Sequence, residues 1–209
     1  MNSTVSSAKA TAKTNVRKMV IVAMLGAVSM ILMWFEIPLW FAPPFYKMDL
    51  SEVPVMIGTF ALGPVSGVFI ELIKVVLKVI TKGTTTAFVG DIANFVIGCS
   101  LIVPAGLVYS RCKSKKSAVF GMVVGTAVMT VAGCLINAYV MLPVYGKAFG
   151  MPMDTLVAMG SAVNPAIKGL GTFVILAVAP FNLLKGLLVS AVTLLLYKHV
   201  SPVLKSNQM

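Results

Sequence analysis

Long stretches without a charged side chain constrain this chain more than any other feature. They are Met19–Phe35, Ile92–Ser110 and Ser117–Gly146. A helix rises about 1.5 Å per residue, so crossing a hydrocarbon core about 30 Å thick takes about 20 apolar residues. With 58% hydrophobic and only 11% charged residues, the chain also has too little polar surface to cover a soluble globule. We therefore expect an all-α integral membrane protein.

Basic residues flank the apolar runs, and loops rich in lysine and arginine stay on the cytoplasmic side of a membrane. They form three groups: Lys9, Lys13, Arg17 and Lys18; Arg111, Lys113, Lys115 and Lys116; and Lys198, His199 and Lys205. All three lie on one side if the chain crosses the membrane six times. We predict six transmembrane helices in one bundle with both termini cytoplasmic. The net charge of +11 then reflects orientation, and nucleic acid is not an expected partner.

The predicted domains are a basic cytoplasmic tail over residues 1–16, a membrane domain over 17–204 and a short cytoplasmic tail over 205–209. The expected spans are Arg17–Ile37, a helix opened by Asp49–Glu52, Val65–Ile80 after the tight turn Leu62–Pro64, Asp91–Tyr109, Ser117–Leu142 and Pro180–Tyr197. Asp49 or Ser51 is expected to cap the second helix, a structural role that needs no further function. Residues 145–179 are expected to form an outer connection with an interfacial or re-entrant helix.

The stretch from Pro38 to Gly98 is unusually rich in acidic side chains. Five of the six acidic residues lie in or beside it, namely Glu36, Asp49, Glu52, Glu71 and Asp91. A helix bundle in lipid does not need such a concentration, so we interpret this stretch as the outer wall and lid of a small-molecule pocket. In the third span Glu71, Lys74 and Lys78 share one helix face. Two interpretations are open: the three neutralise one another, with Lys78 extending outward to the interface, or they contact a ligand or a neighbouring loop. The first is favoured.

The loop after the first span is rich in aromatic residues and interrupted by prolines. Trp40, Phe41 and Phe45 surround Pro43 and Pro44. Aromatic residues commonly gather at a membrane interface, whereas a rigid aromatic loop can also cover a flat ring system. The sequence leaves these two interpretations open.

Four polar side chains are expected at one depth, near the outer ends of the last three spans. They are Asn94, Asn137, Asn182 and Lys185. A lone asparagine can merely hydrogen-bond a neighbouring helix. Four such groups under an aromatic loop favour a binding pocket, because amides and an ammonium in an apolar wall recognise the edge of a planar ligand.

Sequence motifs for catalysis are missing from this chain. The single histidine, His199, follows the last span, and neither a zinc-binding pattern nor a phosphate-binding loop occurs. Cys99, Cys112 and Cys134 lack disulfide or metal-ligand spacing. We expect no enzyme activity and no metal, and any ATPase that drives transport must be another chain.

The segments DLSEVPVMIGTFALGPVSGVFIELIKVVLK and KGTTTAFVGDIANFVIG resemble the riboflavin-specific substrate-binding (S) component of energy-coupling-factor (ECF) vitamin transporters. Ala23-x-x-x-Ala27 in the first span and Asn182-x-x-Lys185 in the last resemble this family as well. The resemblance extends over residues 17–204.

This resemblance implies a high-affinity riboflavin-binding subunit of an ECF-type ABC transporter in a prokaryotic plasma membrane. Riboflavin would be its transported substrate, with flavin mononucleotide and roseoflavin as further candidates, and no cofactor is implied. Asn137, Asn182 and Lys185 would hydrogen-bond the isoalloxazine ring, with Asn94 as a weaker candidate. The loop residues Leu39, Trp40, Phe41 and Ala42 would cover it. Ala23 and Ala27 would dock on a transmembrane coupling protein that works with two ATPases.

Two alternatives differ in class. One is an S component for a different vitamin, such as thiamine or a pantothenate-like acid. The other is a membrane-embedded enzyme that modifies a lipid, which would need a carboxylate or histidine constellation at the interface.

Overall fold

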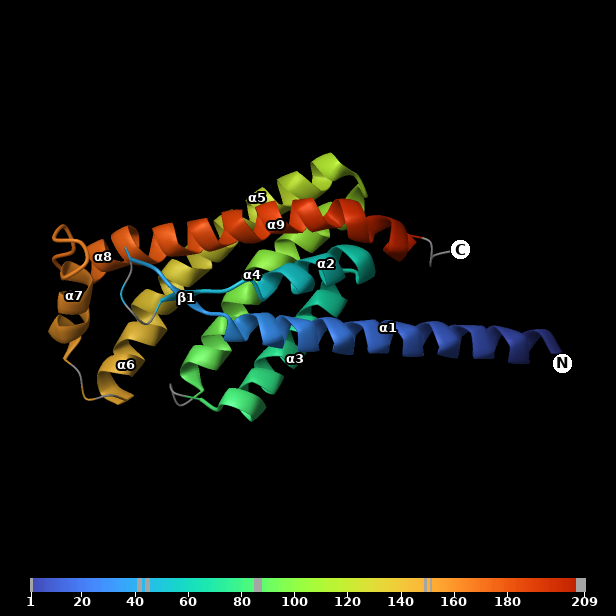
Figure 1. Cartoon of the computed structure of the whole chain (residues 1–209), viewed down its shortest axis with the longest axis horizontal. Coiled ribbons are helices and arrows are strands. Elements are labelled where there is room, and N and C mark those ends of the chain that lie inside the picture. The colour runs from blue at the N-terminus through green and yellow to red at the C-terminus, as the bar shows by residue number, and fades with distance from the viewer. Residues whose placement is uncertain are drawn as a thin grey trace.

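The computed structural model describes residues 2–40, 43, 46–84, 88–148, 150 and 152–205, and these are mostly helical (Figure 1). The elements are α1 (Asn2–Trp34), β1 (Ile37–Pro38), β2 (Lys47–Met48), α2 (Glu52–Leu62), α3 (Pro64–Lys82), α4 (Val89–Arg111), α5 (Lys115–Ile136), η1 (Asn137–Met141), α6 (Leu142–Ala148), α7 (Met153–Ser161), α8 (Leu170–Phe173), η2 (Val174–Val178) and α9 (Ala179–Lys205). The two η segments are π-helical.

Four helical stretches of the described chain are long and apolar enough to cross a membrane. They are Val16–Trp34, Val89–Arg111, Lys115–Lys147 and Leu170–Leu196. Helix α2, with 11 residues, is shorter than an ordinary span, and α3 differs from one because it carries buried charges. The structure is mostly helical, with β1 and β2 as two short strands, and the four candidate spans agree with the predicted class of a helical membrane protein.

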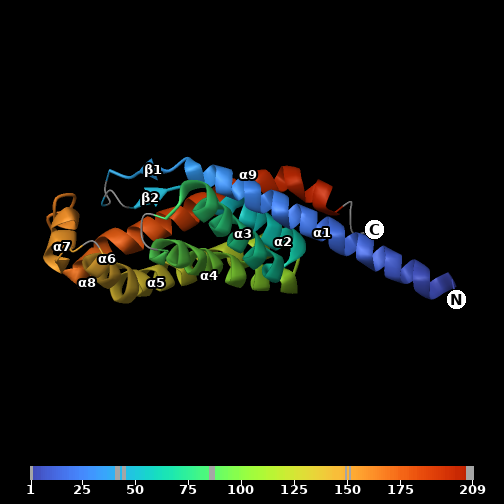
Figure 2. The same cartoon turned by 90° about the horizontal axis from the view of Figure 1, so that it is seen from below.

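The bundle has two distinct ends. The N-terminal end of α1 and the C-terminal end of α9 lie at the same end of the molecule in both views (Figures 1 and 2). The short strands β1 and β2 and the helices α6, α7 and α8 lie toward the opposite end.

The α2–α3 hairpin forms as its sequence predicts. Gly63 adopts φ 93°, a conformation that residues with a side chain rarely take, and Pro64 occupies the start of α3. Glycine therefore allows the sharp reversal, and proline begins the next helix without losing a helical hydrogen bond.

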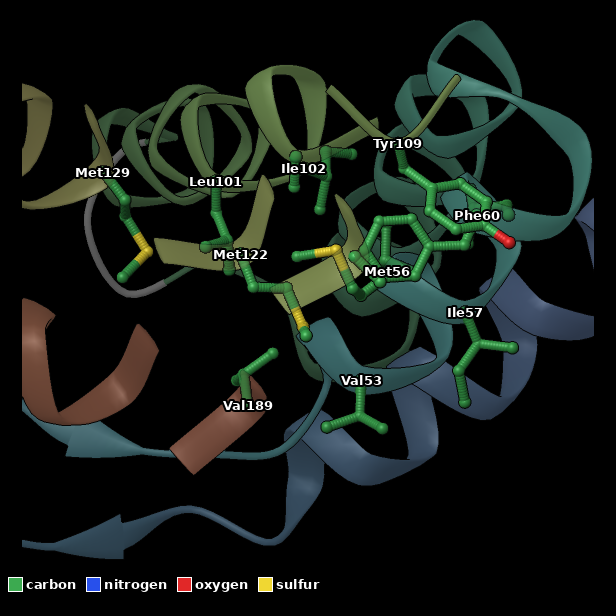
Figure 3. Packing of buried hydrophobic residues seen from close by; sticks show 14 residues of the cluster. Val53, Met56, Ile57, Phe60, Leu101, Ile102, Tyr109, Met122, Met129 and Val189 are labelled. Carbon is green, nitrogen blue, oxygen red and sulfur yellow. The ribbon is translucent and has the colours of Figure 1, made fainter. Parts of the chain in front are cut away.

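Helices α4 and α5 approach closely because α5 carries glycines where they meet. A Cβ atom added at Gly121 would lie 2.7 Å from the backbone oxygen of Ala105, and one added at Gly125 would collide with the backbone oxygen of Leu101. A buried apolar cluster fills the adjoining space (Figure 3) and includes Val53, Met56, Phe60, Leu101, Ile102, Tyr109, Met122 and Val189. This cluster joins α2, α4, α5 and α9.

The last span differs from the prediction that it begins at Pro180. Helix α8, segment η2 and helix α9 run on without a break, so residues 170–178 belong to this span and not to the outer connection. A π turn explains the difference: the N–H of Ala179 bonds to the oxygen of Val174, five residues back, directly before the proline. Proline lacks an N–H and clashes with the carbonyl four residues back, and the wider turn relieves both problems.

Segment η1 repeats this arrangement in the preceding span. The N–H of Leu142 bonds to the oxygen of Asn137, and Pro143 follows at once. The fifth span therefore continues into α6 beyond the predicted end at Leu142.

The remaining part of the outer connection forms a cap. Leu156 of α7 and Ile167 pack on Phe173 of α8, which is fully buried. The expected interfacial or re-entrant helix rested on the apolar residues 170–178, which belong to the last span, whereas the helix of this connection is α7.

The aromatic loop begins and ends in a short antiparallel hairpin, in which Ile37 pairs with Met48 and Pro38 with Lys47. Glu36 lies next to it and forms ion pairs with Lys47 at 3.0 Å and Lys82 at 3.2 Å. Partial burial would raise the pKa of Glu36, but the two lysines hold this pKa below its usual value. The hairpin is thereby tied to the end of α3.

Candidate functional site

A cavity of about 180 Å³ lies where the loop before α2 meets α4, α5, η1 and α9. One water molecule needs only about 10–15 Å³ by a comparable measure, so this void is of ligand size. Side chains from distant parts of the sequence line it: Tyr46, Lys47, Asp49, Glu52, Gly90, Ala93, Asn94, Ile97, Met129, Asn137, Met141, Tyr145, Phe181, Asn182 and Lys185.

Two asparagines on neighbouring helices line the cavity in the same way. The side-chain amide of Asn137 donates to the oxygen of Gly133 at 2.8 Å, and that of Asn182 donates to the oxygen of Val178 at 2.9 Å. Each bond reaches back four residues and fixes the rotamer of the amide. Asn137 also accepts a hydrogen bond of 2.6 Å from the Tyr46 hydroxyl. Burial raises the pKa of Tyr46, so this hydroxyl keeps the proton that it donates.

The π turns help to set the positions of these amides. Asn137 is the first residue of η1, and Asn182 follows η2 by one helical turn. A π turn inserts an extra residue and rotates the later part of the helix, and such turns often occur at functional sites.

Asn94 lines the cavity from α4. Its Oδ1 atom is buried and has no hydrogen-bond partner within the described part of the chain. Buried polar atoms are almost always paired, so this oxygen is available to a donor on a bound molecule.

Lys185 is 7% exposed and lies between two carboxylates. Its Nζ atom is 3.2 Å from Asp49 Oδ2 and 3.6 Å from Glu52 Oε1. Asp49 in turn accepts a 2.8 Å hydrogen bond from the backbone N–H of Ser51 and another from its hydroxyl. Burial would raise the pKa of Asp49, but Lys185, with smaller contributions from Lys74 and Ser51, holds this pKa below its usual value.

The charges continue behind the cavity wall into the α2–α3 hairpin. Lys74, with no exposed surface, lies 2.9 Å from Glu52 Oε1 and 2.7 Å from Glu71 Oε1. The favoured prediction, mutual neutralisation, is confirmed for Glu71 and Lys74. It is wrong for Lys78, which does not extend outward but pairs with Asp91 at the start of α4, at 2.6 Å.

The predicted site residues fall into three groups. Asn94, Asn137, Asn182 and Lys185 all line the same cavity. In the loop, Leu39 packs against the cluster around Phe173 and Trp40 is 90% exposed, whereas Phe41 and Ala42 lie outside the described residues. On α1, Ala23 is exposed and Ala27 half-buried, while Gly26 between them packs against Ile73 of α3.

The sequence indicated that Pro38–Gly98 forms a pocket wall, but it did not assign Asp49 and Glu52 to the cavity that they line. Asp49 and Glu52 were expected to serve the start of α2, and Asp49 or Ser51 to cap it. Ser51 occupies the cap position without a side-chain cap bond. Asp49 accepts the Ser51 N–H at the helix start with Oδ1 and faces Lys185 with Oδ2. The concentration of acidic residues around Pro38–Gly98 indicated a wall, but it did not show that Asp49 and Glu52 pair with a lysine of the last helix.

Known proteins resemble this chain over most of its length. Residues 17–197 match the profile of the family described as "ECF transporter, substrate-specific component". The chain is 31% identical to the riboflavin transporter RibU of Staphylococcus aureus (strain TCH60), and the match covers 90% of this chain and 93% of that protein. It is also 31% identical to the riboflavin transporter FmnP of Bacillus subtilis (strain 168), over the same shares of the two chains.

A solved structure agrees with these matches. The S component of a bacterial ECF transporter superposes with a TM-score of 0.71 at 30% identity, over 91% of this chain and 99% of that chain. A match to the family profile over most of the chain, together with this common fold, identifies the family. The chain belongs to the substrate-specific components of ECF transporters.

Proposed function

We propose that this protein is the riboflavin-binding subunit of an ECF transporter that mediates riboflavin uptake in a prokaryotic plasma membrane. The observation that supports this most directly is the cavity that Asn94, Asn137, Asn182 and Lys185 line together. Relatives named riboflavin transporters, similar over most of their length, support the same ligand.

The chemistry of the wall suits a flavin. The isoalloxazine ring has a flat apolar body and an edge with alternating carbonyl acceptors and an imide donor. Asparagine supplies both a donor and an acceptor, and lysine supplies donors only. In the proposed complex, Asn137, Asn182 and Lys185 bind the polar edge, Asn94 adds a contact from α4, and residues 39–42 cover the ring.

The charge of the wall supports an uncharged ligand. The wall contains two cationic residues, Lys47 and Lys185, and two anionic residues, Asp49 and Glu52, so its formal charges cancel. Thiamine is a cation and a pantothenate-like vitamin an anion, and each would bring a charge that the neutral wall does not balance, at some cost. Riboflavin is neutral, which favours it over these alternatives, and also over flavin mononucleotide.

We further propose six membrane crossings, with α2 and α3 as the second and third, both termini cytoplasmic, a membrane domain over residues 17–204 and tails over 1–16 and 205–209. The three basic groups support this orientation. Labelling of single cysteines placed in the tails and in the turn at Arg111–Lys115 tests it: none should react from outside intact cells.

The subunit itself is proposed to bind and release riboflavin without catalysing a reaction. A transmembrane coupling protein and two ATPases supply the energy. The exposed face of α1 around Ala23 and Ala27 is the proposed docking surface, because small residues let another helix approach closely. Large residues at both positions should abolish uptake in the assembled transporter and leave riboflavin binding by the isolated subunit intact.

Binding is tested with the protein purified in detergent. It should carry the visible absorption bands of a flavin or quench the fluorescence of added riboflavin, and in a thermal-shift panel of vitamins riboflavin should stabilise it most. A shift with another vitamin and none with riboflavin would favour an S component of different specificity.

A further inference from the structure

We propose that Asp49 and Glu52 are positioning residues that hold the ammonium of Lys185 in place for the ligand. This inference rests on the proposed riboflavin-binding function. It assigns a role to two carboxylates that lie beside the ligand-binding residues expected from the sequence.

Lys185 needs such support because of its own chemistry. A lysine side chain has four flexible carbons and loses rotamer entropy when it is fixed. A charge in an apolar wall is also costly unless it is paired. The carboxylates of Asp49 and Glu52, at 3.2 and 3.6 Å from Nζ, meet both needs.

Both carboxylates are fixed in turn by groups that do not line the cavity. Ser51 donates two hydrogen bonds to Asp49 Oδ1, which leaves Oδ2 for Lys185. Lys74 holds Oε1 of Glu52 and also pairs with Glu71. Lys185 is therefore fixed through two carboxylates at the start of α2, before any ligand is present. Groups fixed in the binding geometry raise affinity because less order is lost on binding.

Asp49 and Glu52 could instead bind hydroxyl groups of the ligand directly, since both line the cavity. A double-mutant cycle separates the two roles. The dissociation constant of riboflavin is measured by fluorescence quenching for the wild type, Asp49→Asn, Lys185→Met and the double variant. If Asp49 acts through Lys185, its substitution matters only while the lysine is present.

We expect Asp49→Asn and Lys185→Met each to weaken binding by about 10- to 100-fold. The double variant should be no weaker than Lys185→Met alone. Asp49→Glu, which keeps the carboxylate, should recover most of the lost affinity, whereas a mere effect on folding would appear in the thermal midpoint. Asp154→Asn, the same substitution at an exposed carboxylate of α7, is the matched control and should bind like the wild type.

Effects that add in the double variant, or an Asp49→Asn variant with wild-type affinity, would overturn the positioning role. If Asp49→Asn does not fold, the same cycle with Glu52→Gln decides, with the same expected dependence on Lys185. A wild-type protein that does not bind riboflavin would instead contradict the proposed function itself.

Discussion

The two ends of helix α5 use glycine for different purposes. Near its N-terminal end, Gly121 and Gly125 lie so close to backbone oxygens of α4 that a side chain would not fit between them. Near its C-terminal end, a Cβ atom at Gly133 would lie 2.7 Å from the side-chain nitrogen of Asn182. At one end glycine lets two backbones touch; at the other it makes room for a polar side chain of the cavity.

This difference divides the molecule into a packed end and a binding end. The apolar cluster of Figure 3 fills the first, whereas the helices leave a cavity at the second. The same helices α2, α4, α5 and α9 build both. Substitutions at the two ends should therefore change different properties, stability at one and affinity at the other.

The largest effect should come from Gly125→Leu at the packed end. Its side chain meets the backbone oxygen of Leu101, which cannot move without separating α4 from α5. We expect a loss of more than about 4 kcal/mol, enough to prevent folding. Folded yield in detergent, judged by size-exclusion chromatography, measures this effect. Val123→Leu, on the exposed face of the same helix, is the control and should fold normally.

At the binding end, Asn182→Leu should reduce riboflavin affinity by about 10- to 100-fold, because a hydrogen bond of about 1.5–3 kcal/mol is lost from the proposed site. The thermal midpoint without ligand should change little. Fluorescence titration measures the first quantity and a thermal scan the second. Asn164→Ala, outside the cavity lining, should leave the affinity unchanged; equal losses in both variants would contradict the site.

Gly133→Ala should have a smaller and indirect effect. The new methyl group displaces the amide of Asn182 and leaves the backbones of α5 and α9 in place. Affinity should fall by about tenfold, or about 1.4 kcal/mol. In a double variant with Asn182→Leu, Gly133→Ala should weaken binding no further, because the amide that it displaces is absent. A further loss in the double variant would show that Gly133 matters for another reason.

The smallest effect should be that of mildly acidic pH. In the folded protein the pKa of Asp49 lies below its usual value. The ion pair with Lys185 therefore contributes its full stability at any pH above that usual value. It is lost only as pH falls through the lowered pKa. The contribution of Asp49 to riboflavin affinity, measured as the ratio of the dissociation constants of Asp49→Asn and the wild type, should thus be nearly constant from about pH 8 down to about pH 5. A marked decline within this range would mean that Asp49 is not held charged by Lys185.

Much of this division could be predicted from residue types and spacing. The cavity groups Asn94, Asn137, Asn182 and Lys185 could be found because polar residues are conspicuous near the ends of apolar helices. The close contact at Gly121 and Gly125 follows from small residues four apart.

Other features could not be predicted, for identifiable physical reasons. Pro180 looked like a helix start because proline is tolerated there, and hydrophobic periodicity does not reveal a π turn that accommodates it. Asp49 looked like a capping residue because its partner, Lys185, is distant in sequence. Lys78 likewise pairs with Asp91 across a turn between helices. Each of these depends on contacts that only the folded chain brings together.

The π turn before Pro180 has a consequence for exchanging segments between relatives. One extra residue rotates the two parts of a helix by about 100° relative to each other. This rotation determines on which side of the bundle the cap built from α7 and α8 lies. A relative whose last helix lacks the extra residue must present its own connection on another side. A chimaera joined within η2 would therefore need its residue count matched, or its cap would point into lipid.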